Sequence, residues 1–117
     1  MGMASHCEER HSPLTASILE PALLVLLKAQ PRHGYTLLSD LASLGLNLLH
    51  PSVVYRALRE MEDLEWVQSG WDTDQTQGPP RRVYRLTTQG EEALRNWQEE
   101  LQRMQELIGR LLALSQS

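Results

Sequence analysis

An apolar heptad repeat in the C-terminal part of the chain restricts what residues 87–117 can fold into. Apolar side chains recur there at alternating spacings of three and four residues: Leu94, Trp97, Leu101, Met104, Ile108 and Leu111. This seam predicts one long helix, capped by Thr88 or Thr87, whose apolar stripe packs against a partner helix. At ~1.5 Å per residue the helix is about 40 Å long, more than a small domain can cover. The simplest partner is a second copy of the chain in a twofold dimer, with the six seam residues at the interface.

The length and charge of the chain limit the classes of protein to which it can belong. A chain of 117 residues is long enough for one modest core. The formal net charge of −4 argues against a protein that coats nucleic acid over its whole surface, although a local basic face stays compatible with it. The longest apolar run, residues 21–27, is far shorter than the ~20 residues of a membrane span, and no signal segment opens the chain. We therefore expect a cytoplasmic protein.

The first eleven residues are polar and lack an apolar period, which predicts a flexible N-terminal arm over residues 1–11. His6, Cys7 and His11 lie in this arm. The single cysteine cannot form an internal disulfide, which fits a reducing compartment. We expect a tail without metal or cofactor. A metal or haem site shared by two copies, or a redox switch at Cys7, stays open as an alternative.

Residues 12–86 carry the pattern of three helices followed by two strands. Helices are expected over residues 13–29, where Pro21 either kinks the helix or begins a second segment, over 34–44, and over 51–64. Strands are expected over 66–71 and 82–86, joined by a long loop rich in turn-forming residues. The predicted fold class is therefore mainly α: a winged helix-turn-helix domain with a two-stranded wing, then the long helix of residues 87–117.

Positive charge gathers at two places in this otherwise acidic chain. The third helix carries a polar and basic face at i, i+3, i+4 and i+7, formed by Ser52, Tyr55, Arg56 and Arg59. The stretch GPPRRVYRLT at residues 78–87 places arginines behind a rigid corner, where the loop joins the second strand. A plainer interpretation is that Arg56 and Arg59 form surface ion pairs with Glu60 and Asp63, and that the hairpin is an ordinary solvated one.

Four stretches stand in a recognisable order and spacing: LEPALL at 19–24, HGYTL at 33–37, VYRALREME at 54–62 and GPPRRVYRLT at 78–87, followed by Gly90. Together they resemble the PadR family of bacterial transcriptional regulators, in its compact branch with a single C-terminal dimerisation helix. The resemblance covers about residues 18–115. It implies a homodimer that binds a palindromic operator, usually as a repressor, and that responds to a small effector. Members of the family often carry Lys-Tyr where this chain has Arg82-Val83, and the N-terminal arm lies outside the resemblance.

A winged helix-turn-helix that reads DNA would place the third helix in the major groove and the wing against a phosphate or the minor groove. The DNA-binding residues expected on this basis are Tyr35, Ser52, Tyr55, Arg56, Arg59, Arg81 and Arg82. Tyr35 has packing in the core as an alternative role.

The family resemblance also implies a ligand site on the long helix. Flat aromatic compounds bind between paired tryptophans in compact members, and Trp97 matches that position. Trp97 and Leu101 are therefore the expected effector-binding residues, with packing alone as the alternative role of Trp97.

Two other classes of function compete with a DNA-binding regulator. The first is a protein-interaction module whose heptad helix binds another protein and whose winged domain no longer reads DNA. The second is an enzyme that uses Cys7 and His11, which the sequence opposes. It has no glycine-rich phosphate loop, nucleophile elbow or clustered pair of carboxylates, so no catalytic residue is predicted.

Overall fold

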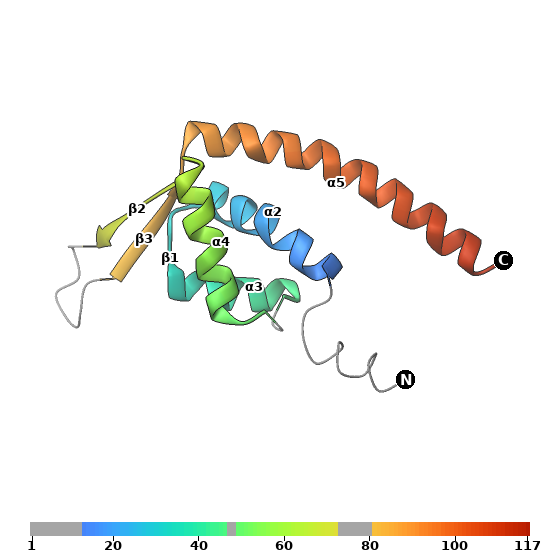
Figure 1. The fold of residues 1–117 in the computed structure, drawn as a ribbon, viewed down its shortest axis with the longest axis horizontal. Coiled ribbons are helices and arrows are strands. Elements are labelled where there is room, and N and C mark those ends of the chain that lie inside the picture. The colour runs from blue at the N-terminus through green and yellow to red at the C-terminus, as the bar shows by residue number, and fades with distance from the viewer. Residues whose placement is uncertain (1–12, 47–48, 73–80) are drawn as a thin grey trace.

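The computed structural model describes residues 13–46, 49–72 and 81–117. The elements follow in the order α2 (Pro13–Ala29), β1 (Arg32–His33), α3 (Gly34–Leu44), α4 (Pro51–Asp63), β2 (Val67–Asp72), β3 (Arg81–Leu86) and α5 (Thr88–Ser115). Three short helices and a small sheet form one body, and α5 runs past α2 and projects beyond it (Figure 1). The predicted arm and the Gly78-Pro79-Pro80 corner lie outside the described residues. The predicted fold class is confirmed.

Helix α2 is the centre of the hydrophobic core. It continues through Pro21, whose side chain is fully buried, so of the two alternatives considered at this residue the second segment is wrong. Leu23 and Leu24 are completely buried beside it. Around α2 the core takes residues from every helix and from the sheet: Leu37, Leu41, Val54, Leu58, Met61, Val67, Tyr84, Ala93 and Leu94. This shared core fixes the position of α4 relative to the strands.

Helices α3 and α4 end in the same backbone motif with different residues. The residue after the last turn of α3 is Gly45, which has φ +104° and donates its N–H to the carbonyl of Ala42. The corresponding residue after α4 is Glu65, with φ +65°, and its N–H bonds to the carbonyl of Glu62 at 3.0 Å. A left-handed conformation suits glycine and costs energy at other residues. The turn between α4 and β2 is therefore under backbone strain.

The sheet has three strands in the order β1-β3-β2, where a two-stranded wing was expected. The wing hairpin β2–β3 forms as predicted, and β1 adds an antiparallel pairing of Arg32 with Tyr84 and of His33 with Val83. A strand of two residues carries no periodic signal, which is why the sequence did not predict it. The extra strand ties the start of α3 to the wing.

Helix α5 begins in the core and ends in solvent. Thr87 is its N-cap and accepts the N–H of Gly90 at 3.0 Å, so the cap is Thr87 and not Thr88. Ala93 and Leu94 are buried against the core, whereas the residues beyond Leu101 are exposed. None of the helices that the described residues form is long and apolar enough to cross a bilayer.

Candidate nucleic-acid interface

A groove lies where the start of α3, the outer part of α4 and the strand β3 meet. It has a volume of about 370 Å³ and is lined by His33, Gly34, Tyr35, Tyr55, Arg81, Arg82 and Tyr84. Four of the seven predicted DNA-binding residues therefore come together at one place: Tyr35, Tyr55, Arg81 and Arg82. The Tyr55 ring packs closely on Gly34, since a Cβ atom at that position would lie 2.8 Å from Tyr55 Cε1. Gly34 thus allows α3 and α4 to meet at the groove.

Tyr35 is placed at the mouth of this groove and is 75% exposed. Core packing, the alternative role considered for Tyr35, is therefore wrong. At the opposite extreme, Tyr84 is buried, and this burial raises the pKa of its phenol above the ordinary 10.0, an effect that the nearby Arg82 partly offsets.

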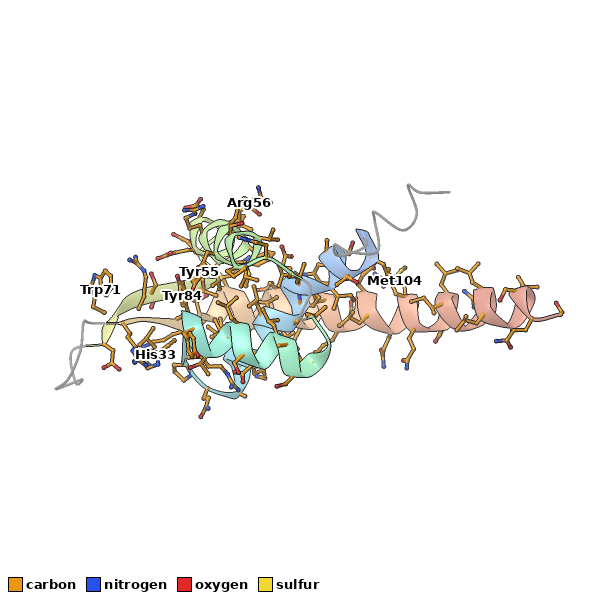
Figure 2. The ribbon with its side chains drawn as sticks, turned by 90° about the horizontal axis from the view of Figure 1, so that it is seen from below. His33, Tyr55, Arg56, Trp71, Tyr84 and Met104 are labelled. Atoms are coloured by element: carbon orange, nitrogen blue, oxygen red, sulfur yellow. The ribbon has the colours of Figure 1, made fainter. Side chains whose placement is uncertain are left out.

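The exposed face of α4 continues the basic surface beyond the groove. Arg56 and Arg59 lie on this face, and Figure 2 shows Arg56 on the side of α4 away from the other helices. Neither arginine forms an ion pair within residues 13–46, 49–72 and 81–117, so the pairs with Glu60 and Asp63 that the plainer interpretation required are absent there. Both guanidinium groups are thus available to a partner.

The N-terminus of α4 is capped by the residue before its proline. His50 Nδ1 accepts the N–H of Ser52 at 3.1 Å and lies 2.8 Å from Ser52 Oγ. Ser52 stays exposed on the first turn. No N–H group is left over in that turn, because Pro51 carries none and those of Val53 and Val54 bond to the carbonyl of His50. The positive end of the helix dipole still favours a phosphate at this N-terminus.

The wing arginine Arg82 is held in place by a chain of contacts that reaches α4. Its Nε donates to Ser69 Oγ at 2.9 Å, and the same hydroxyl donates to Glu62 Oε2 at 2.6 Å. The guanidinium also lies over the ring of Trp71, its partner in the β2–β3 register. The orientation of the wing arginine is therefore coupled to the helix that carries Arg56.

A second contact stiffens the outer end of the sheet. His33 Nε2 lies 3.0 Å from Asp72 Oδ2, which joins the strand β1 to the end of β2 across β3. Arg81 stands opposite Asp72 in the strand register and is exposed. Within the described ranges, no three side chains that bind metals gather into a site. His6, Cys7 and His11 lie outside those ranges.

The long helix offers two further surfaces. Beyond the core, an apolar stripe on α5 is exposed: Met104, Leu107, Ile108, Leu111, Leu112 and Leu114. Leu94 is only 2% exposed because the hydrophobic core of the same chain covers it. The part of the seam that is available to a partner therefore begins beyond this residue. Met104, the first residue of this stripe, is labelled on α5 in Figure 2.

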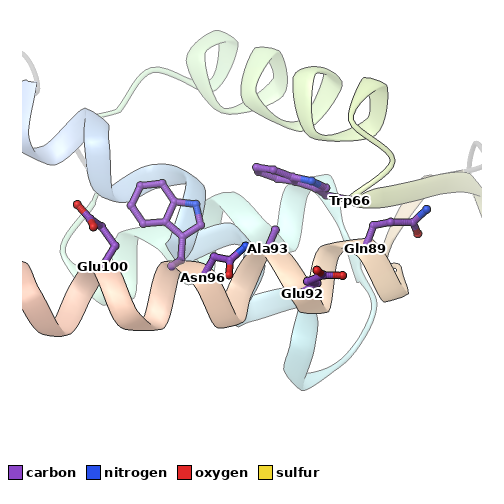
Figure 3. A pocket seen from close by; sticks show the side chains of 7 residues that line it. Trp66, Gln89, Glu92, Ala93, Asn96 and Glu100 are labelled. Atoms are coloured by element: carbon purple, nitrogen blue, oxygen red, sulfur yellow. The ribbon is translucent and has the colours of Figure 1, made fainter.

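A larger cavity, of about 620 Å³, lies at the start of α5. Its lining consists of Trp66, Gln89, Glu92, Ala93, Asn96, Trp97 and Glu100 (Figure 3). Of the two residues expected to bind an effector, Trp97 lines this cavity and Leu101 does not. Trp97 is fixed by a hydrogen bond from its Nε1 to Glu20 Oε1 at 2.8 Å.

Sequence reasoning missed Trp66 and Trp71 as site residues. Trp66 lines the cavity with Trp97, and Trp71 supports Arg82 and is 62% exposed. The pairing of Trp71 with Arg82 depends on the hairpin register, which a loop of about ten residues does not determine. The aromatic character of both residues in a β-type run was the only available signal.

The arrangement of a capped helix with free arginines beside a wing defines a winged helix-turn-helix DNA-binding domain. The sequence profile of the family "Transcriptional regulator PadR-like family" matches residues 23–96. The chain belongs to this family of DNA-binding transcriptional regulators, whose members are in general not enzymes.

Solved structures agree with this assignment. A conserved protein described as a potential transcriptional factor is 33% identical, over 86% of this chain and 90% of its own, with a TM-score of 0.73. A PadR family transcriptional regulator from Eggerthella lenta is 28% identical, over 85% of each chain, with a TM-score of 0.74. A PadR-like regulator from Bacillus cereus shares the fold, with a TM-score of 0.77 at 22% identity, over 86% of this chain and 97% of its own. No curated protein matches the chain.

Proposed function

We propose that the chain is a sequence-specific transcriptional repressor that binds a palindromic operator as a homodimer and responds to a small effector. In this proposal residues 12–86 read DNA and residues 87–117 form the dimerisation helix. The observation that carries the proposal is the outer face of α4, where Arg56 and Arg59 form no ion pair with any described residue. Repression follows if the bound protein blocks access to a promoter, which is the role that the family resemblance implies.

In the proposed complex α4 enters the major groove by its N-terminal half. Arg56 reads a base edge, Arg59 follows the groove, and Ser52 with the first turn of α4 faces a phosphate. The acidic residues Glu60, Glu62 and Asp63 occupy the other half of α4, so repulsion by DNA fixes which end of the helix approaches.

The groove and the wing contact the flanking backbone in this complex. Tyr35 and Tyr55 donate to phosphate oxygens, and Arg81 and Arg82 lie against a phosphate or in the minor groove. The contacts of Arg82 with Ser69 and Trp71 support this role, because they hold the guanidinium in one orientation before DNA arrives.

The exposed stripe on α5 supports the homodimer. Large apolar side chains exposed in a row along a helix call for a partner surface. A second copy of α5 supplies one with the same repeat. The proposed interface comprises Trp97, Leu101, Met104, Ile108 and Leu111, with Leu94 behind them in the core. A twofold dimer then presents two copies of α4 to two half-sites, which explains a palindromic operator.

The test is a comparison of three alanine variants on operator and scrambled duplexes. Arg56→Ala should lose about 1–3 kcal/mol of discrimination between the two duplexes. Arg59→Ala should weaken binding with a smaller loss of discrimination. Arg95→Ala is the matched control, since Arg95 is an exposed arginine of α5 away from this face. Equal losses on both duplexes for Arg56→Ala would refute its assignment to base reading.

A further inference from the structure

One of the acidic residues of α4 is turned toward the wing. Glu60 and Asp63 are exposed on this helix, whereas Glu62 is only partly exposed. The Oε2 atom of Glu62 accepts the hydroxyl of Ser69, on the strand β2, at 2.6 Å. Glu62 therefore connects α4 to the wing.

The Ser69 hydroxyl joins Glu62 to the wing arginine. A hydroxyl has one proton to donate, and an ionised carboxylate can only accept. The contact with Glu62 therefore fixes the direction of that proton. The lone pairs of the same oxygen are left for Arg82, whose Nε donates to it at 2.9 Å. Without an acceptor at position 62 the hydroxyl would rotate, and Arg82 would lose a defined acceptor.

Arg82 is held in two ways and reaches the surface that is expected to face DNA. Its Nε is bound to Ser69, and its guanidinium lies over the ring of Trp71. The same residue lines the groove together with Tyr55. A guanidinium presents its donors in one rigid plane. Holding Nε and the plane therefore sets the direction of the donors on the two terminal nitrogens.

The buried Tyr84 shows that Glu62 and Arg82 are close enough to act on the same group. Burial raises the pKa of its phenol, Arg82 lowers that pKa, and Glu62 raises it. The two opposite charges thus lie around one side chain of the groove. Each offsets part of the field of the other, so Glu62 repels DNA less than an isolated carboxylate on α4 would.

We propose that Glu62 is a positioning residue for DNA binding, an acidic side chain of α4 that strengthens binding because it fixes Ser69 and, through it, Arg82. The proposal rests on the proposed function, which assigns Arg82 to a phosphate or to the minor groove. Its consequence is the opposite of what charge alone would produce. A carboxylate on a helix that faces DNA repels the phosphates, so by charge alone its removal tightens binding.

The sizes of the two effects decide the sign. A carboxylate and a phosphate about 10 Å apart in water interact weakly, and salt screens them further. Loss of the charge alone should therefore tighten binding by less than about twofold. Loss of a hydrogen bond that orders a charged group should weaken binding by about three- to tenfold. Positioning thus outweighs repulsion at this residue.

Two substitutions of Glu62 separate the hydrogen bond from the charge. Glu62→Gln and Glu62→Met remove the same charge, but only glutamine keeps an oxygen that can accept from Ser69. Binding is measured on a duplex of the segment upstream of the chain's own gene. Glu62→Met should weaken it about three- to tenfold, and Glu62→Gln should stay within about twofold of the wild type.

Glu60→Met is the matched control for these variants, because it removes an exposed carboxylate of the same helix. It should leave binding unchanged or tighten it slightly. Equal affinities of Glu62→Met and Glu62→Gln would overturn the proposal, and so would a Glu62→Met variant that binds as tightly as the wild type.

A double-mutant cycle tests the route through Arg82. In the Arg82→Ala background, Glu62→Met should no longer weaken binding, since the residue that Glu62 positions is absent. A loss of the same size in both backgrounds would overturn this route. Urea unfolding of each variant checks that the fold is kept. Ser69→Ala removes the central link and should weaken binding as Glu62→Met does, which keeps the test decisive if Glu62→Met does not fold.

The positioning itself is measured without DNA. In heteronuclear NMR spectra of the full chain, the Nε–H signal of Arg82 is identified by its absence in Arg82→Lys. It should be sharp in the wild type and in Glu62→Gln, and broadened by exchange with water in Glu62→Met. An unchanged signal in Glu62→Met would overturn the positioning role. If the wild-type protein binds no DNA, the proposed function fails, while this spectrum still decides whether Glu62 orders Arg82.

Discussion

The guanidinium of Arg82 lies over the indole of Trp71, with Cζ 5.2 Å from the ring centroid. The two residues are directly paired across the wing hairpin, and Trp71 reaches the outer end of the sheet in Figure 2. This contact places an apolar ring and a fixed positive charge on the surface that the wing presents to a partner.

Replacing Trp71 should weaken DNA binding without changing the number of phosphate charges that the protein neutralises. Trp71→Ala should cost about 0.5–1 kcal/mol of binding free energy, because the guanidinium loses its support. The slope of log K against log salt should stay unchanged, whereas Arg82→Ala should reduce it by about one. Trp71→Phe is the control. A lower salt slope in Trp71→Ala would show that the tryptophan does more than orient the arginine.

Two glycines of α5 should respond in opposite ways to alanine. A Cβ atom on Gly90 would lie 2.1 Å from the carbonyl oxygen of Trp66, whereas nothing lies within 4 Å of one on Gly109. Gly90→Ala should lower the free energy of unfolding by at least about 2 kcal/mol. Gly109→Ala should raise it by up to about 1 kcal/mol through helix propensity. Urea unfolding measures both, and an unchanged midpoint for Gly90→Ala would contradict the close packing at this corner.

Glycine at position 65 should stabilise the fold. Glu65 has the left-handed conformation that Gly45 adopts at the equivalent place after α3. Glu65→Gly should therefore raise the free energy of unfolding by about 1 kcal/mol and raise the melting temperature by several degrees. Gly45→Ala is the inverse control and should lower the melting temperature. A less stable Glu65→Gly variant would mean that the side chain of Glu65 stabilises the turn more than its backbone strain costs.

Burial of Tyr84 predicts a loss of stability in alkali. The folded state raises the pKa of this phenol above 10.0, chiefly by desolvation, so folding favours the protonated form. The stabilisation is complete below the unfolded pKa and is lost as the pH rises through the folded one. The free energy of unfolding should fall as the pH rises past 10.0, more steeply than in Tyr84→Phe. Parallel curves for the two proteins would contradict the shifted pKa.

The sequence predicted the elements whose signals are local. The boundaries of α3 followed from its apolar period and Gly45, and the start of α4 followed from Pro51. The two-residue strand β1 and the continuity of α2 through Pro21 depend on tertiary packing, which overrides a local signal.

The same difference between local signals and tertiary packing explains why only part of the site could be predicted. The basic face of α4 can be read from helical spacing, because Arg56 and Arg59 belong to one element. The contacts of Arg82, and the cavity that Trp66 and Trp97 both line, join residues far apart in the sequence, and only the fold brings them together.

The central claim is that a dimer of this chain reads a DNA sequence, and one titration tests it most directly. The purified protein, with its mass measured by light scattering, is titrated against the segment upstream of its own gene and against a scrambled duplex at two salt concentrations. We predict a dimer that binds the upstream segment more tightly, with an affinity that falls as salt rises. A monomer, or equal affinity for both duplexes at both salt concentrations, would contradict the account.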